Sequence, residues 1–265
     1  MNINNRKSSL GNLIKAEYQK VAFLKFSKVF LISIILASLT LGLIFSLTTS
    51  VTQGKAISEM SSIDVISSCM LGVDVTAIML IIFAAISNAK EFSTKQIHVT
   101  LAVTPNRKKL FLSKLITYFL LAMIVSFIVT ALTFLAGQLI LLINGSSMAS
   151  LADLFLRQFI LGTLFMPVFY CLLTVAAVFV FRSSGGAITF SLAVMFIPAL
   201  IKMFSQSIQK IILPLLPQES LHSLSGTVSE GSIEILGIGA SIILLFMWIG
   251  ITSLIGTFQF VRKDV

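Results

Sequence analysis

The chain has 265 residues, of which 57% are hydrophobic and only 11% are charged, and its net charge is +9. An ordinary soluble domain carries about a quarter charged residues, so this composition excludes a typical soluble globular protein. The 22 Phe exclude a disordered chain, and the presence of only two Cys excludes a disulfide scaffold. The sequence therefore predicts an all-α integral membrane protein.

Six apolar runs are long enough to cross a bilayer, which takes about 20 residues of α-helix. We expect them to form a six-span transmembrane domain over residues 29–260, preceded by residues 1–28 and followed by a short tail, 261–265. The six predicted spans are Val29–Thr49, Cys69–Ala89, Leu115–Ile143, Leu154–Phe181, Ala187–Met203 and Ile233–Phe260.

Basic residues are distributed unevenly between the two sides of these spans. Fifteen of the 19 Lys and Arg fall on the side that holds both termini. Cytoplasmic loops carry an excess of Lys and Arg, so both termini are predicted to lie in the cytoplasm, at the plasma membrane of a bacterial cell. Topology and anionic lipid headgroups account for the positive charge, so a lipid membrane is expected as a partner and nucleic acid is not. The four basic residues on the other side are Lys55, Arg157, Lys202 and Lys210.

The sequence lacks the patterns that would predict chemistry in the chain itself. It contains no glycine-rich phosphate loop followed by Lys and Ser or Thr. We therefore expect that the chain is not an enzyme and binds no cofactor. His98 and His222 are predicted on opposite faces of the membrane with no Cys or carboxylate cluster, so no metal is expected. Cys69 and Cys171 are predicted at different depths and should remain unpaired.

Asp74 is the one ionisable residue that we expect at membrane depth, where such groups often serve transport. It is predicted about one turn inside the outer end of the second span. A carboxylate hydrated at the membrane surface is therefore favoured over a proton or ion relay.

The segment 90–114 is the longest one expected on the cytoplasmic side between two spans, and its pattern is amphipathic. Phe92 and Leu101 supply apolar anchors, and Pro105 would end a helix before the third span. A short helix of this kind, expected over 90–108, could dock into a groove on a soluble partner. The alternative is an interfacial helix that only lies on the lipid headgroups.

Residues 1–28 also contain an amphipathic helical pattern. Leu13, Tyr18 and Val21 fall on one predicted face, and Glu17 interrupts that face. A lone carboxylate within an apolar stripe suits a membrane surface poorly. We therefore expect Glu17 to contact a partner protein or a basic residue of the cytoplasmic helix.

Small and hydroxyl residues recur at helical spacing in two spans, which lets helices approach closely in lipid. Two roles fit this pattern equally well: packing within one subunit, and a dimer seam or translocation pathway. The residues are Ser38, Gly42 and Ser46 in the first span, and Ser126, Thr130 and Thr133 in the third.

The segment 204–232, between the last two spans, is too apolar for a solvated loop and is interrupted by Pro214 and Pro217. Irregular backbone at membrane depth must be covered by protein, so a partly re-entrant hairpin in the outer leaflet is expected. Four side chains of this region and its flank are expected to face outward into solvent: Glu219, His222, Glu230 and Glu234.

In its order of motifs the chain resembles the ABC-2-type permeases, the membrane subunits of ATP-binding-cassette exporters. The residues Glu17 to Lys20 are similar to the connecting-helix signature of that family, and residues 260–264 to its usual C-terminal end. The chain departs from the family at Lys95-Gln96, where many members carry Gly-Thr. The pattern after the second span is similar to a coupling helix at Glu91-Phe92, Leu101, Pro105, Arg107 and Lys114.

The resemblance implies a connecting helix within 1–28, a coupling helix over 90–108, and a re-entrant hairpin before the last span. It implies a permease that forms the translocation pathway with a second copy or a paralogue. It also implies coupling to a separate ATP-binding-cassette ATPase subunit that binds ATP-Mg. Antimicrobial peptides, drugs and other amphipathic substrates are the expected cargo, with sodium as an alternative. The residues expected to couple to the ATPase are Glu17, Glu91, Phe92, Leu101 and Arg107.

Two other functions are left open by the sequence. A secondary transporter driven by an ion gradient would need interrupted helices and a charge at the membrane midplane, and only Pro167 and Pro198 fit this pattern. A non-transporting scaffold or sensor would bind a partner without any nucleotide-dependent change.

Overall fold

The computed structural model describes residues 9–103, 106–227 and 236–262, and all regular structure in these ranges is helical. Six of the described helices are long and apolar enough to cross a membrane, which confirms the six-span prediction. They are α2 (Lys25–Gln53), α3 (Ser62–Ser93), α5 (Arg107–Ile143), α6 (Leu154–Phe181), α7 (Ser184–Ile201) and α10 (Ile238–Arg262). The shorter helices are α1 (Leu10–Phe23), α4 (Gln96–Val103), α8 (Gln206–Ile212) and α9 (Pro217–Ser225), with 3-10 turns at Ile57–Glu59 and Leu213–Leu215.

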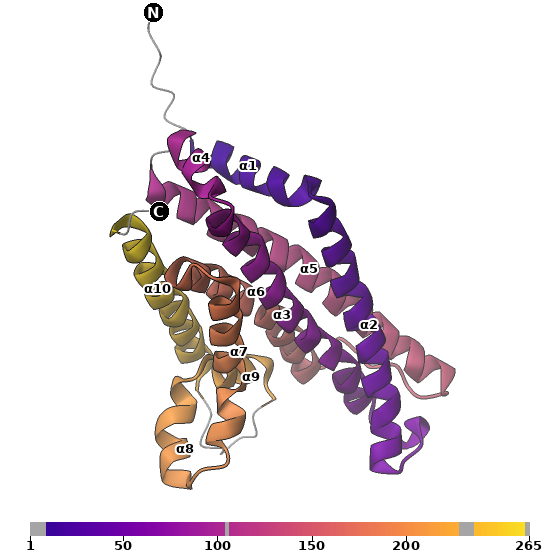
Figure 1. Cartoon of the computed structure of the whole chain (residues 1–265). Helices are drawn as coiled ribbons and strands as arrows, with labels where there is room; N and C mark the ends of the chain where they lie inside the picture. The colour runs from indigo at the N-terminus through magenta and orange to yellow at the C-terminus, as the bar shows by residue number, and fades with distance from the viewer. Residues whose placement is uncertain (1–8, 104–105, 228–235, 263–265) are drawn as a thin grey trace, which may run out of the picture.

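The long helices run roughly side by side, and α1 lies across one end of them (Figure 1). At that end, here called the α1 end, lie α4, the start of α5 and the end of α10. The opposite end carries α8, below α7, and is called the α8 end. Helices α3 and α6 are the most buried of the long helices, so they form the centre of the bundle.

A break in the backbone separates α1 from α2 and lets α1 turn across the bundle. Ser9 caps the start of α1 by accepting a hydrogen bond from the backbone amide of Asn12, and Leu24 between the two helices is extended. The buried face of α1 consists of three residues at a spacing of four, Leu13, Glu17 and Val21. The residue that interrupts the apolar stripe in the sequence is thus at the centre of the buried face.

The predicted helix over 90–108 is divided in the structure. Helix α3 continues to Ser93, and α4 begins only at Gln96. Lys95 between them has φ +56°, in the left-handed region that favours Gly. Lys95 therefore has a backbone conformation that is uncommon for a residue with a Cβ. Pro105 lies outside the described residues.

Helix α5 begins two turns before the predicted third span. Its 37 residues extend about 55 Å, well beyond the ~30 Å of a hydrocarbon core. The extra turns lie at the α1 end and are capped by Asn106, whose side chain accepts from the amide of Lys109. Helix α6 has the predicted bounds, and a tight turn at Arg182 and Ser183 leads into α7.

The segment between α7 and α10 folds back onto the bundle. The indole of Trp248 on α10 donates to the carbonyl of Leu215, with N and O 3.0 Å apart. The hydroxyl of Tyr170 on α6 lies 2.7 Å from the Gln218 side-chain oxygen on α9. The predicted hairpin thus consists of two short helices and a 3-10 turn. Its depth in a bilayer stays a prediction.

Candidate functional site

A buried lysine joins three helices at the α1 end. The Nζ atom of Lys114, in the third turn of α5, lies 2.8 Å from Glu17 Oε2 on α1 and 2.8 Å from Glu91 Oε1 on α3. Only 2% of the Lys114 side chain is exposed. One ammonium group therefore holds α1 and α3 to α5, although these helices are far apart in sequence.

A second lysine balances the charge of this cluster. The half-exposed Lys20 lies 2.7 Å from Glu17 Oε1 and 3.4 Å from Glu91 Oε1. We call these four residues, Glu17, Lys20, Glu91 and Lys114, the ion cluster. Burial alone would raise the pKa of Glu17. The combined attraction of Lys114 and Lys20 outweighs this effect, so the pKa of Glu17 lies below its usual value. Both carboxylates are therefore compensated, and removal of either lysine would leave negative charge without its partner.

Four phenylalanine rings pack edge to face beside the ion cluster. The ring of Phe179 on α6 lies at the centre, with ring centroids 5.4 Å from Phe92 on α3, 4.8 Å from Phe111 on α5 and 5.1 Å from Phe260 on α10. Because Phe92 directly follows Glu91, the ion cluster and this aromatic cluster form one continuous contact across five helices.

Two arginines fasten the end of α10 to this aromatic cluster. Arg107 on α5 donates from Nη1 to the carbonyl of Phe260 at 2.6 Å, and its guanidinium lies over the Phe260 ring. Arg182, just after α6, donates to the carbonyl of Gln259 at 3.2 Å. Cations at the last carbonyls of a helix satisfy those acceptors and favour the helix dipole.

The five residues predicted to couple to an ATPase all lie at the α1 end, but mostly face into the chain. Glu17 and Glu91 are buried in the ion cluster, where Glu17 contacts basic residues of α5 and of its own helix rather than a basic residue of the cytoplasmic helix. Phe92 and Leu101 pack against the core, and Arg107 binds α10. Their contact with an ATPase stays a prediction.

The two small-residue sets lie between helices of the same chain. Ser38 on α2 bonds to Thr76 on α3, with the two hydroxyl oxygens 2.7 Å apart. A Cβ added at Gly42 would lie 2.5 Å from the Cys69 carbonyl oxygen. Ser126 on α5 donates to the carbonyl of Leu164 on α6 at 2.6 Å. Both sets therefore take part in packing within one subunit. All six residues are buried: Ser38, Gly42, Ser46, Ser126, Thr130 and Thr133.

Sequence reasoning missed the pairing role of Lys114 and the whole of Lys20's part in the ion cluster. Lys114 was expected at the boundary of a span, where positive residues are common, and nothing in its local pattern predicted burial. The signal was the isolated Glu17, because a carboxylate in an apolar stripe needs a buried cation.

A second polar region lies where α9 meets α3, α6 and α7. Glu219 is fully buried and pairs with Lys202 at 3.1 Å, which corrects the prediction that it faces solvent. It is buried because α9 folds back between the long helices. His222 is partly exposed, with 3.6 Å between its Nδ1 and Glu219 Oε2. The predicted outward positions of Glu230 and Glu234 lie outside the described residues.

Asp74 on α3 borders this polar region. Because α3 begins at Ser62, Asp74 lies about 18 Å along the helix, more than three turns from its start rather than one. It is half-buried and lines a cavity. The two cysteines are both buried and unpaired, as expected.

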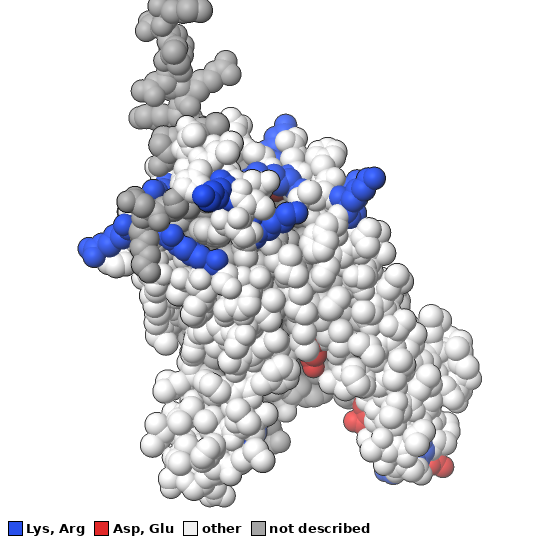
Figure 2. Space-filling view, in the orientation of Figure 1, with Lys and Arg blue, Asp and Glu red and all other residues white. Residues whose placement is uncertain are grey.

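Charge is concentrated at the α1 end. Figure 2 shows Lys and Arg gathered around that end and almost no charge along the sides of the bundle.

The profile of the ABC-2 family transporter protein matches residues 13–217. The chain belongs to the ABC-2 transporter family. No curated protein matches the chain.

Membership of the ABC-2 family identifies the chain as a transporter permease subunit of a membrane. Such a subunit works with an ATPase subunit and is not itself a catalytic enzyme. The matched residues include most of α1, all of α4 and the entire ion cluster. Within the part of the chain that the structure describes, no three His, Cys, Asp or Glu side chains gather to hold a metal ion.

Proposed function

We propose that this ABC-2 permease subunit forms the pathway of an exporter that moves amphipathic substrates out of the cytoplasm. Antimicrobial peptides and drugs are the substrates we expect. Energy would come from ATP-Mg, bound and hydrolysed on a separate ATPase subunit. The observation that carries the proposal is the buried Lys114, which pairs with Glu17 of α1 and Glu91 of α3.

The ion cluster would let force applied at the α1 end reach the transmembrane helices. If an ATPase moved α1 alone, Lys114 would lose a partner and a carboxylate would be left buried without compensation. Breaking a buried pair in this way costs about 3–5 kcal/mol. Movement of α1 together with α3 and α5 avoids that cost, so the three helices would respond as one body.

The side chains that would touch the ATPase are those that point away from the ion cluster. Tyr18 on α1 and Val99 on α4 are large apolar residues that remain 54% and 69% exposed at the α1 end. Exposed apolar side chains among polar neighbours are typical of docking surfaces. We propose that these residues contact the ATPase, while Glu17 and Glu91 position their helices from behind.

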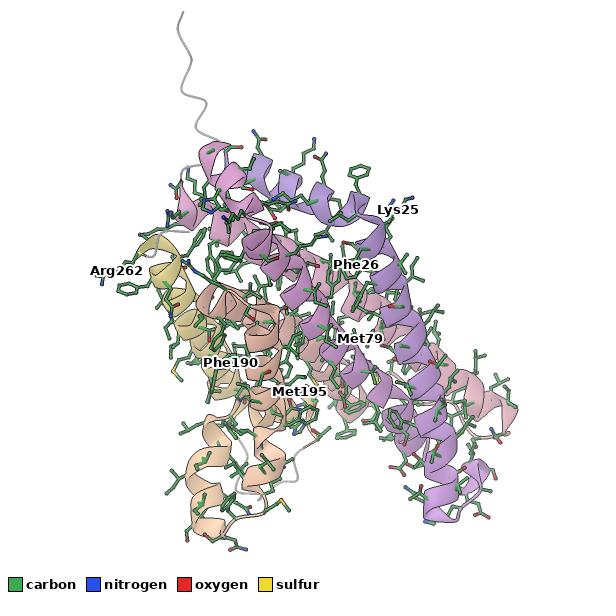
Figure 3. The ribbon with its side chains drawn as sticks, in the orientation of Figure 1. Lys25, Phe26, Met79, Phe190, Met195 and Arg262 are labelled. Carbon is green, nitrogen blue, oxygen red and sulfur yellow. The ribbon has the colours of Figure 1, made fainter. Side chains whose placement is uncertain are left out.

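A second permease copy or a paralogue would complete the pathway. Figure 3 shows Met79 on α3 between Phe26 on α2 and Phe190 and Met195 on α7. Phe26 is 47% exposed, and Met79 and Phe190 are half-buried. We propose that the second permease packs against this face of α2, α3 and α7, so that the pathway lies between the two copies.

The proposal is tested in inside-out membrane vesicles that contain the chain and its ATPase. Uptake of a fluorescent cationic peptide should require ATP-Mg and should persist when ionophores collapse all ion gradients. The matched control contains an ATPase that binds ATP without hydrolysing it. Uptake that follows the ion gradient and ignores ATP would support a secondary transporter instead. An ATPase that binds the chain without any uptake would support a scaffold.

A further inference from the structure

A cavity between α3, α6 and α9 has both polar and apolar walls. Its volume is about 280 Å³, and it lies on the α8 side of the ion cluster. Hydroxyl groups, one carboxylate and one imidazole form its polar part, and methionine, leucine, phenylalanine and one glycine form the rest. The residues that define it are Ser67, Asp74, Phe159, Thr163, Leu221 and His222.

Asp74 is the carboxylate of this cavity, and His222 acts on it electrostatically. It forms no hydrogen bond or ion pair with another residue in the described ranges, whereas the nearby Glu219 is paired with Lys202. Besides Asp74, the titratable group that borders the cavity is His222, whose Nε2 lies 3.0 Å from the Gln218 amide nitrogen. Among the described residues that line the cavity, there is neither Lys nor Arg. The cavity therefore has the charge to bind a cation.

An apolar groove adjoins the cavity. Its volume is about 420 Å³, its walls come from α5, α6, α9 and α10, and its lining is almost entirely hydrocarbon, including Phe119, Phe165 and Phe246. Gly162 and Leu221 line both the cavity and the groove. A ligand whose charged end lies at Asp74 thus meets a hydrophobic surface a short distance away.

The walls shared by the cavity and the groove are held firmly. Helix α9 is linked to α6 through Tyr170 and Gln218 and to the end of α7 through Lys202, and the 3-10 turn just before α9 is linked to α10 through Trp248. A Cβ added at Gly162 would lie 2.3 Å from Ser225 Cα, so α6 and α9 are in direct backbone contact. Because these walls are already fixed, binding a ligand costs little free energy for ordering the side chains of the site.

We propose that this cavity binds the ammonium group of a cationic amphiphile at Asp74, with the hydrocarbon of the ligand in the adjoining groove. A phospholipid headgroup fits less well, because its phosphate would face Asp74 with no basic residue lining the cavity. Binding does not depend on export. The further statement that the bound amphiphile is cargo rests on the proposed function.

The single tryptophan of the chain provides a direct test. Trp248 lies on α10 beside Leu245 and Ile249, which line the groove. The full chain, purified in a neutral detergent, is titrated with 11-bromoundecylammonium, whose bromine quenches indole fluorescence at short range. The matched probe is 11-bromoundecanol, which lacks the charge. We expect saturable quenching by the ammonium probe with at least tenfold higher affinity than the alcohol.

Two variants assign the binding to Asp74. Asp74→Asn should lower the affinity for the ammonium probe about tenfold or more and leave the affinity for the alcohol unchanged. Asp64→Asn, on the same helix but exposed, should change neither. Because a probe could bind without quenching, the same titrations are followed by the rise in melting temperature that a ligand of the folded state produces.

Three results would overturn the inference. They are equal affinity of the two probes, unchanged ammonium binding by Asp74→Asn, and displacement of the probe by phosphatidylethanolamine in nanodiscs, which would assign the site to a lipid. None of these measurements uses ATP or the ATPase. Loss of ammonium selectivity would therefore refute this site alone, and failure of ATP-driven uptake would refute the proposed function alone.

Discussion

Lys114 shows how one residue can connect distant parts of a membrane protein. Its ammonium group is almost fully buried but is bound by two carboxylates, one from each neighbouring helix. An isolated ammonium would be costly in this environment, and the pairs make it tolerable only while both helices stay in place. The side chain therefore makes the positions of α1 and α3 depend on each other.

Replacement of Lys114 by Met should destabilise the protein strongly. The substitution leaves Glu17 and Glu91 with only the half-exposed Lys20, so we expect the free energy of unfolding to fall by about 3–5 kcal/mol. The melting temperature in detergent, followed by the fluorescence of Trp248, measures this loss.

The matched control removes one positive and one negative charge together. The double variant Glu91→Gln with Lys114→Met leaves Glu17 paired with Lys20, so it should recover much of the lost stability. Equal melting temperatures for the single and double variants would contradict the pairing.

The lowered pKa of Glu17 predicts a defined pH dependence. A carboxylate whose pKa is lowered on folding contributes stability that is complete above its unfolded pKa, about 4.3, and is lost as the pH falls through the folded pKa. The difference in melting temperature between the wild-type chain and Glu17→Gln should therefore be largest near pH 7 and shrink below about pH 4. A difference that grows on acidification would be inconsistent with this sign.

The sequence indicated which residues matter better than it indicated the contacts that they make. The break that Glu17 makes in an apolar stripe indicated that a partner was needed, and the structure supplies a basic residue from α5 rather than from the cytoplasmic helix. Glu219 was predicted in solvent because local sequence does not reveal that α9 folds back into the bundle. Ion pairs between helices depend on tertiary packing, which short-range patterns do not encode.

Among the helices, α2 and α3 cross in direct backbone contact at Gly42 and Gly72. A Cβ added at Gly72 would lie 2.2 Å from the Ser38 carbonyl oxygen and 3.1 Å from Gly42 Cα. Backbone atoms cannot move aside as a flexible side chain can. Glycine at this crossing is therefore needed for the packing of the first two spans.

Gly72→Ala should separate α2 from α3 and lower the free energy of unfolding by about 1–3 kcal/mol. Gly250→Ala in α10 is the matched control, since nothing lies within 4 Å of its added Cβ. That control should keep or slightly raise the melting temperature, because Ala favours helix over Gly. If the two variants melted alike, the close crossing would be wrong.

Arg107 joins α5 to the last turn of α10, so Arg107→Ala should loosen that end of the last span. The loss of a charged hydrogen bond costs about 1.5–3 kcal/mol. In the proposed exporter, ATP hydrolysis should continue while transport per ATP falls severalfold. Parallel assays of phosphate release and vesicle uptake measure this ratio.

Lys108→Ala is the control for Arg107→Ala, because Lys108 is the exposed neighbour. It should leave both phosphate release and uptake unchanged. Normal transport per ATP by the Arg107 variant would exclude a role for this link in coupling.

The long helices were the most predictable elements, because a membrane span is specified by composition and length alone. All six were predicted from apolar runs, and α6 has the predicted bounds. The division of 90–108 between α3 and α4 was not predicted, since it depends on the left-handed backbone of Lys95. Sequence patterns are weakest where a turn is formed by a residue that is uncommon in that conformation.

At the scale of the whole molecule, the distribution of charge predicts its orientation. Basic residues surround the α1 end in Figure 2, and the positive-inside rule places such an end in the cytoplasm. The two native cysteines are fully buried, so single exposed cysteines can be labelled against a low background.

Lys55→Cys should react with an impermeant maleimide in intact cells, and Lys108→Cys should react only after permeabilisation. Both positions are exposed, and they lie at opposite ends of the bundle. Labelling of Lys108→Cys in intact cells would reverse the predicted orientation and remove the α1 end as a docking surface for a cytoplasmic ATPase.

The proteins that co-purify with this ABC-2 permease show whether it works with a separate ATPase. The tagged chain is purified from its own membranes in mild detergent, and mass spectrometry and an ATPase assay are applied to what co-purifies. We expect an ATP-binding-cassette subunit in about equal amount, with measurable ATP hydrolysis. A stable chain that purifies alone, without an ATPase, would contradict this expectation.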